Sequence, residues 1–145
     1  LAEDSEGLLL LTTDGMMSEV VRSKKVEKEY YAQVDGIITE EAVAQLKNGV
    51  EIGFNGRKYR TKKCTASLLN EIPNLGERGK KIRDERHGPT SWVSITLTEG
   101  KFRQVRKMTS AVGFPTLRLV RVRVGNIHLN DLKAGEVLEV ASFDV

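Results

Sequence analysis

The sequence contains few residues that could crosslink the chain or bind a metal ion. Its only cysteine is Cys64, which excludes an internal disulfide and indicates a reducing compartment such as the cytoplasm. One cysteine with His87 and His128 cannot form a zinc-type cluster, and no calcium-loop pattern is present. No apolar run approaches the roughly 18 residues of a membrane span. These absences predict a protein that binds no metal and does not lie in a membrane.

Charged residues, by contrast, are abundant. The 145-residue chain is 39% hydrophobic and 30% charged, which predicts one globular domain. The net charge is only +3, but the sequence pI is about 9.0 and the basic residues are clustered. The chain carries no signal peptide and begins at Leu1 rather than at a methionine, so we expect that further residues precede it.

Hydrophobic periodicity predicts alternating strands and helices. The run 8–13 predicts a buried strand, 16–22 a short helix, 26–36 a strand with Tyr30 and Tyr31 on opposite faces, and 40–48 a helix capped by Thr39. Residues 50–52 and 57–69 predict a hairpin, 70–89 a loop, and 90–99 a strand. A helix is expected within 100–113, then a strand at 117–124 and a last strand at 137–140. Because Leu119 and Val120 are adjacent apolar residues in an alternating strand, we expect a β-bulge between them.

Basic residues recur on four separate segments and are accompanied by a few aromatic residues. A single charge run is more often a solvated face than a binding site. Recurrence on several segments instead favours a nucleic acid, because Lys and Arg neutralise phosphates and an aromatic ring can stack on a base. The sequence therefore predicts binding to RNA.

Three local motifs make the chain resemble the bacterial rRNA pseudouridine synthases of the small-subunit/large-subunit group. That family opens its catalytic motif with Gly-Arg-Leu-Asp-x-x-Ser/Thr-x-Gly, an aliphatic run and Thr, which Leu1, Ser5, Gly7 and 8–12 match. Its second motif, a basic residue two before a tyrosine, is matched by Lys28 and Tyr30. Its third, Glu-Gly-Lys/Arg-x-x-Gln-Val-Arg/Lys-Arg/Lys-Met, is matched by 99–108. Residues 89–92 and 112–119 point to branch E of the large-subunit synthases.

The resemblance implies an α+β catalytic domain over 1–145, with a mostly antiparallel mixed sheet and flanking helices and loops around an RNA-binding cleft. We expect it to lack the first strands of the usual domain and to contain no S4 domain. The implied activity is isomerisation of a uridine to pseudouridine in large-subunit rRNA by a cofactor-free monomer. The implied catalytic residues are Tyr30, which stacks on the base, and Arg106, which pairs with the catalytic aspartate. The RNA-binding candidates are Lys28, Arg57, Lys58, Arg60, Lys62, Lys63, Arg83, Arg86, Lys101, Arg103 and Lys107.

The sequence departs from the family motif at its nucleophile. Ala2 occupies the aspartate position, and a methyl group can neither attack a sugar or a base nor pair with Arg106. Asp4 is two residues away, about 6–7 Å along an extended chain, which is too far to substitute. Either an aspartate has been replaced by Ala2 or the chain is a natural inactive relative. The alternatives to an enzyme are a non-catalytic rRNA-binding or ribosome-assembly protein and a protein that binds polyanions without specificity.

Overall fold

A computed structural model describes residues 6–7, 26–73, 75, 88–101 and 103–128 of the chain. Its main sheet has six strands in the order β1-β7-β2-β6-β5, with β8 paired to β7. β1 (Glu6–Gly7) is parallel to β7 (Thr116–Val124), and every other pairing in the sheet is antiparallel. The remaining strands are β2 (Lys28–Asp35), β5 (Thr65–Leu69), β6 (Thr90–Leu97) and β8 (Ile127–His128). The predicted α+β class with a mostly antiparallel mixed sheet is confirmed.

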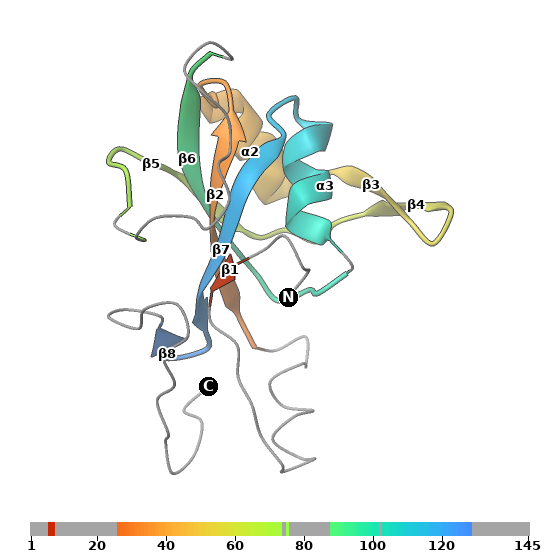
Figure 1. The fold of residues 1–145 in the computed structure, drawn as a ribbon. Helices are drawn as coiled ribbons and strands as arrows, with labels where there is room; N and C mark the ends of the chain where they lie inside the picture. Colours follow the sequence, from red (N-terminus) through yellow and green to blue (C-terminus); the bar gives the residue numbers. More distant parts are fainter. Residues whose placement is uncertain (1–5, 8–25, 74, 76–87, 102, 129–145) are drawn as a thin grey trace.

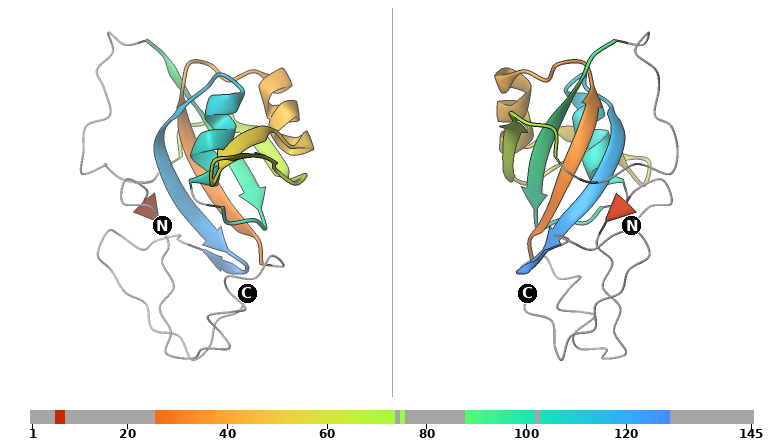
Figure 2. Two further views of the ribbon diagram at one scale, coloured as in Figure 1. Left: turned by 90° about the vertical axis from the view of Figure 1, so that its right-hand side faces the viewer. Right: turned by 60° about the vertical axis from the view of Figure 1, so that its left-hand side comes forward.

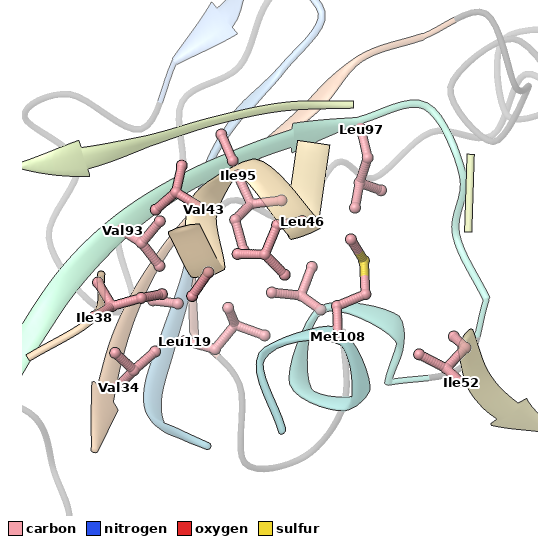
Figure 3. Close-up of a cluster of buried hydrophobic side chains, with 14 residues drawn as sticks. Val34, Ile38, Val43, Leu46, Ile52, Val93, Ile95, Leu97, Met108 and Leu119 are labelled. Carbon is pink, nitrogen blue, oxygen red and sulfur yellow. The ribbon is translucent and has the colours of Figure 1, made fainter. Parts of the chain in front are cut away.

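Two helices, α2 (Glu40–Asn48) and α3 (Gln104–Ala111), lie on one face of this sheet (Figures 1 and 2). Helix α2 begins where the Thr39 hydroxyl accepts a hydrogen bond from the Ala42 amide, and its C-cap is Gly49, as predicted. Leu46 and Met108 are fully buried between the helices and the sheet, where they meet Ile95 and Leu119 (Figure 3). The hydrophobic core therefore lies between this helical layer and one face of the sheet.

The strands β3 (Glu51–Phe54) and β4 (Arg57–Arg60) form a separate two-stranded sheet that extends beside α3 (Figure 1). The predicted hairpin is confirmed, but its second strand does not continue to Leu69. The chain leaves β4 at Thr61, whose hydroxyl accepts a hydrogen bond from the Val50 amide, and then joins the main sheet as β5. The strand prediction for 57–69 was wrong because sequence alternation did not reveal this change of sheet.

The predicted bulge between Leu119 and Val120 is also wrong. These residues pair consecutively with Ala32 and Tyr31, and the register shifts lie at Val122 and Leu117 instead. Leu119 belongs to the core cluster, whereas Val120 is buried outside that cluster. The two adjacent apolar residues therefore reflect burial on both faces of the strand, and no β-bulge is needed to explain them.

Several predicted elements lie outside the described residues: the strand at 8–13, the helix at 16–22, most of the 70–89 loop and the strand at 137–140. The predicted strands at 26–36 and 90–99 are confirmed as β2 and β6, and the predicted helix within 100–113 is confirmed as α3. Among the described residues, no helix is long and apolar enough to cross a membrane.

Candidate RNA-modification site

Residues of the first and second motifs lie on one cross-strand row of paired residues in the main sheet. Gly7 of β1 pairs with Arg121 of β7, and Arg121 pairs on its other side with Tyr30 of β2. Since neighbouring strands lie about 4.8 Å apart, the backbones of Gly7 and Tyr30 are roughly 10 Å apart. The strand register thus brings together residues that are far apart in the sequence.

Gly7 allows this close approach because it has no side chain. A Cβ at this position would lie 2.2 Å from the carbonyl oxygen of Arg121 and 2.5 Å from its amide nitrogen. The φ of Gly7 is +113°, a backbone conformation that L side chains rarely adopt. The glycine of the first motif is therefore needed for strand pairing.

A β-bulge at Val122 sends two arginines of β7 to opposite faces. Arg121 pairs with Tyr30 and Arg123 with Glu29, which leaves Val122 as the extra residue between them. Residues directly opposite each other share a face, and consecutive residues of β2 point to opposite faces. Arg121 therefore shares the face of Tyr30, which packs against the core beneath the helices. Arg123 lies on the other face, where its Nε donates to Glu29 Oε1 at 3.1 Å.

Lys28 lies two residues before Tyr30, on the same face of β2. Its side chain is buried, and its Nζ donates to the carbonyl oxygen of Thr98 at 3.2 Å. Burial lowers the pKa of Lys28 below its usual 10.5, and the positive charge of Arg121 lowers it further. Two cationic side chains therefore interact beside the tyrosine.

The third motif is built around a buried carboxylate, Glu99. Its Oε1 accepts hydrogen bonds from the Lys62 amide at 2.8 Å and from Gln104 Nε2 at 3.0 Å, and its Oε2 accepts one from the Tyr59 hydroxyl. Glu99 is only 3% exposed, so these donors replace the water that an ionised carboxylate needs. Glu99 thus ties the β3–β4 hairpin to the start of α3.

Two lysines around the start of α3 lie over the aromatic residues of the hairpin. Lys101 Nζ is 5.1 Å from the Phe54 ring centroid and 5.2 Å from that of Tyr59. Lys107 Nζ is 5.9 Å from the Phe54 centroid. Such cation–π contacts hold the lysine stems in place while both residues remain partly exposed.

Arg106 lies on α3, beside the buried residue Val105, and is partly exposed. Val105 and Met108 pack into the same core cluster that Tyr30 contacts. Arg103, just before α3, has a left-handed backbone with φ +54°. The start of α3 and the Tyr30 row thus lie on the same side of the sheet (Figure 2).

The remaining predicted RNA-binding cations within the described residues lie on a second surface, formed by the hairpin and the segment after it. Lys58 lies 3.5 Å from Glu51 in an exposed ion pair, which contributes little to stability. The five exposed basic residues are Arg57, Lys58, Arg60, Lys62 and Lys63. Ala2, Arg83 and Arg86 lie outside the described residues.

Sequence reasoning gave no role to Arg121, Glu99 or Tyr59. Arg121 lies outside the three motifs, and only the strand register shows that it lies opposite Tyr30. Glu99 was recognised only as a position of the third motif, because its partner Tyr59 lies 40 residues away in the sequence. Among the described residues, no group of three or more His, Cys, Asp or Glu side chains could hold a metal ion.

Comparison with known proteins points to the family that the three motifs indicate. The sequence profile of a family described as RNA pseudouridylate synthase matches residues 1–111. The chain is 39% identical over 142 residues to a ribosomal large subunit pseudouridine synthase E of Vibrio parahaemolyticus, covering 97% of this chain and 58% of the relative. It is also 39% identical to the enzyme of that name from Xanthomonas axonopodis pv. citri, covering 91% of this chain and 68% of the relative.

The fold agrees with a solved structure as well. A crystal structure of a pseudouridylate synthase superposes with a TM-score of 0.69 at 28% sequence identity. The match covers 90% of this chain and 48% of the solved chain. The chain therefore spans only about half to two thirds of the length of these relatives.

Proposed function

The chain belongs to the RNA pseudouridylate synthase family, and we propose that its site isomerises a specific uridine of large-subunit ribosomal RNA to pseudouridine. We further propose that the present form is inactive, because Ala2 occupies the position of the nucleophilic aspartate. One observation carries the proposal: Gly7 of the first motif, Tyr30 of the second and the helix of the third all converge on one face of the main sheet.

The proposed reaction rearranges the uridine without adding or removing atoms. The bond between C1′ of the ribose and N1 of the base breaks, the base turns, and C1′ bonds to C5. The proton on C5 is lost and N1 gains one, so neither an oxidant nor a second substrate is needed. What the protein must supply is a carboxylate nucleophile, a surface that holds the detached base, and proton transfer.

Tyr30 is proposed to hold the base. A uridine must leave its stack before it can react, which costs a few kcal/mol, and stacking on an aromatic ring returns about 1–3 kcal/mol. Tyr30 packs against the core on one side and remains partly exposed, which suits a rigid stacking platform.

Arg106 is proposed to hold the nucleophilic carboxylate when an aspartate is present at position 2. A neighbouring guanidinium favours the ionised carboxylate and fixes its direction of attack. Ala2 offers no oxygen for this pairing, which supports the proposal that the present chain binds RNA without converting it.

The basic residues are proposed to bind the RNA backbone over two adjoining surfaces. Around the site these are Lys28, Lys101, Arg103 and Lys107, and on the hairpin side they are Arg57, Lys58, Arg60, Lys62 and Lys63. Glu99 joins the two surfaces through Tyr59 and the Lys62 amide, which supports their acting on one RNA molecule. Arg83 and Arg86 remain part of the proposal from sequence alone.

A tritium-release assay tests the enzyme proposal. The chain and its Ala2→Asp variant are each incubated with a large-subunit rRNA transcript labelled with tritium at C5 of uridine, since isomerisation releases that atom into water. We expect release by Ala2→Asp and none by the present chain. Ala2→Asn, which is similar in size but cannot be ionised, is the matched control and should also release none.

The same assay separates the alternative of a non-catalytic rRNA-binding protein. If Ala2→Asp binds the transcript but releases no tritium, the isomerase proposal is refuted and the binding function remains. Release by the present chain would instead refute the assignment of Ala2 as the missing nucleophile. Equal affinity for unrelated RNA at every salt concentration would favour non-specific polyanion binding.

A further inference from the structure

We propose that Arg121 is an RNA-binding residue of the candidate site, where its guanidinium contacts a phosphate of the strand that carries the target uridine. This inference rests on the proposed function and adds a residue that lies outside all three sequence motifs. It starts from the faces of the strand on which the three arginines of β7 lie, which are Arg118, Arg121 and Arg123.

Arg118 and Arg123 lie on the face away from the helices, where each binds a carboxylate. Arg118 makes a two-pronged contact with Glu6, from Nε to Oε2 at 2.9 Å and from Nη2 to Oε1 at 3.0 Å. Arg123 binds Glu29 at 3.1 Å, and the same glutamate accepts from Ser94 Oγ at 2.8 Å. Both arginines thus serve to join β7 to neighbouring segments.

Arg121 occupies the face of Tyr30 in regular alternation with Leu119, and the bulge at Val122 separates it from Arg123. In a regular strand, residues 119, 121 and 123 would share one face, and all three would point toward the helices because Leu119 packs in the core. A bulge interrupts the hydrogen-bond ladder, and such bulges are common beside active sites, where they redirect a side chain. Here the redirected side chain is Arg123, which is turned toward Glu29, while Arg121 stays on the face of Tyr30 and α3.

The surroundings of Arg121 suit an anion. Its pairing partner is Tyr30, and opposed residues in an antiparallel pair have Cα atoms about 4.5–5.5 Å apart. Lys28, on the same face, is buried and lies close enough for the charge of Arg121 to lower its pKa. Two cationic side chains on one face favour a phosphate beside them.

A phosphate of the RNA strand fits this position better than another anion does. A nucleotide whose base stacks on Tyr30 carries its own phosphates within one nucleotide's length of the ring. Arg presents a planar fork of donors that matches two phosphate oxygens at once. Arg121 is fixed from both sides, because its backbone pairs with Gly7 and with Tyr30. A guanidinium carried by this fixed backbone, next to the stacking ring, would hold the RNA backbone while the base turns.

The salt dependence of RNA binding tests this inference without requiring catalysis. The affinity of the present chain for a large-subunit rRNA transcript is measured at several salt concentrations, together with Arg121→Met, Arg121→Lys and Arg123→Met. Losing one phosphate contact reduces the slope of log K against log salt by about 0.7–0.9. We expect that reduction, and roughly tenfold weaker binding, for Arg121→Met. Arg121→Lys should keep the slope, because it keeps the charge.

Arg123→Met is the matched control, since it removes an arginine from the other side of the same bulge. It should lower the melting temperature by breaking the contact with Glu29 while leaving the salt slope unchanged. If Arg121→Met also leaves the slope at the parent value, the inference about Arg121 is refuted while the proposed function stands. If the parent chain binds no rRNA and Ala2→Asp releases no tritium, the proposed function itself has failed.

Discussion

Replacing Gly7 with alanine should detach β1 from the sheet. The added Cβ would overlap backbone atoms of Arg121 at 2.2–2.8 Å, and no side-chain rotation can relieve a clash with backbone. An alanine at φ +113° would by itself cost about 1–3 kcal/mol in backbone strain. Because the described residues of β1 pair with β7 at two positions, Glu6 and Gly7, separation from β7 is the easier response.

The size of the loss follows from Arg118, which is the main side-chain anchor of β1. Its side chain is 9% exposed, so losing Glu6 leaves a buried guanidinium without that carboxylate. Breaking a buried ion pair costs about 3–5 kcal/mol. The Glu6 side chain is 32% exposed, so water can reach this edge, and we expect about 3 kcal/mol. In a domain of this size the melting temperature should fall by about 6–12 °C.

Urea denaturation and hydrogen–deuterium exchange together measure this effect. Gly53→Ala is the matched control, because a Cβ at Gly53 meets no atom within 4 Å. Amide exchange should rise in residues 6–7 and along β7 in Gly7→Ala but not in Gly53→Ala. In the Ala2→Asp background, Gly7→Ala should also reduce tritium release. Equal stability and equal exchange in the two alanine variants would refute the reasoning about strand pairing.

Two further predictions concern buried charged residues. Glu99→Ala should destabilise the fold by about 3–5 kcal/mol, because it leaves the Tyr59, Lys62 and Gln104 donors without their acceptor. Glu99→Gln should cost about 1 kcal/mol, because the Tyr59 hydroxyl can turn and accept a hydrogen bond from the new amide. Comparable urea midpoints for the two variants would contradict this prediction. For Lys28, the lowered pKa means that the folded state releases its proton before the unfolded state does. Its contribution to the free energy of unfolding should therefore rise with pH between the folded-state pKa and 10.5, and Lys28→Met should lack that rise when stability is compared at about pH 8 and about pH 10. The same rise in both proteins would show that other groups cause it.

Local signals allowed much of the fold to be predicted from the sequence. The Thr39 cap and Gly49 bracket α2 within nine residues, so nothing distant was needed to place that helix. The strand β6 was predicted from alternation, and burial on both faces from Trp92 onward left its position unchanged.

Features that depend on pairing between distant segments could not be predicted in this way. The position of a bulge depends on which partner residues lie opposite, so alternation alone misplaced it and could not show that Arg121 lies opposite Tyr30. The role of Glu99 likewise needed Tyr59 and Lys62, which lie on another element. The motifs themselves pointed to Tyr30 and Arg106, but their meeting on one face is a property of the sheet order.

The pairing of β1 with β7 also has a consequence for biosynthesis. Glu6 is synthesised before its partner Arg118, which follows 112 residues later. At about 5–20 residues per second, a ribosome needs roughly 6–22 seconds to cover that interval. The segments that form β2, α2 and the hairpin all emerge during this time, whereas the row from Gly7 to Tyr30 still lacks its middle strand. A nascent chain therefore cannot assemble the candidate site until most of the domain has been synthesised.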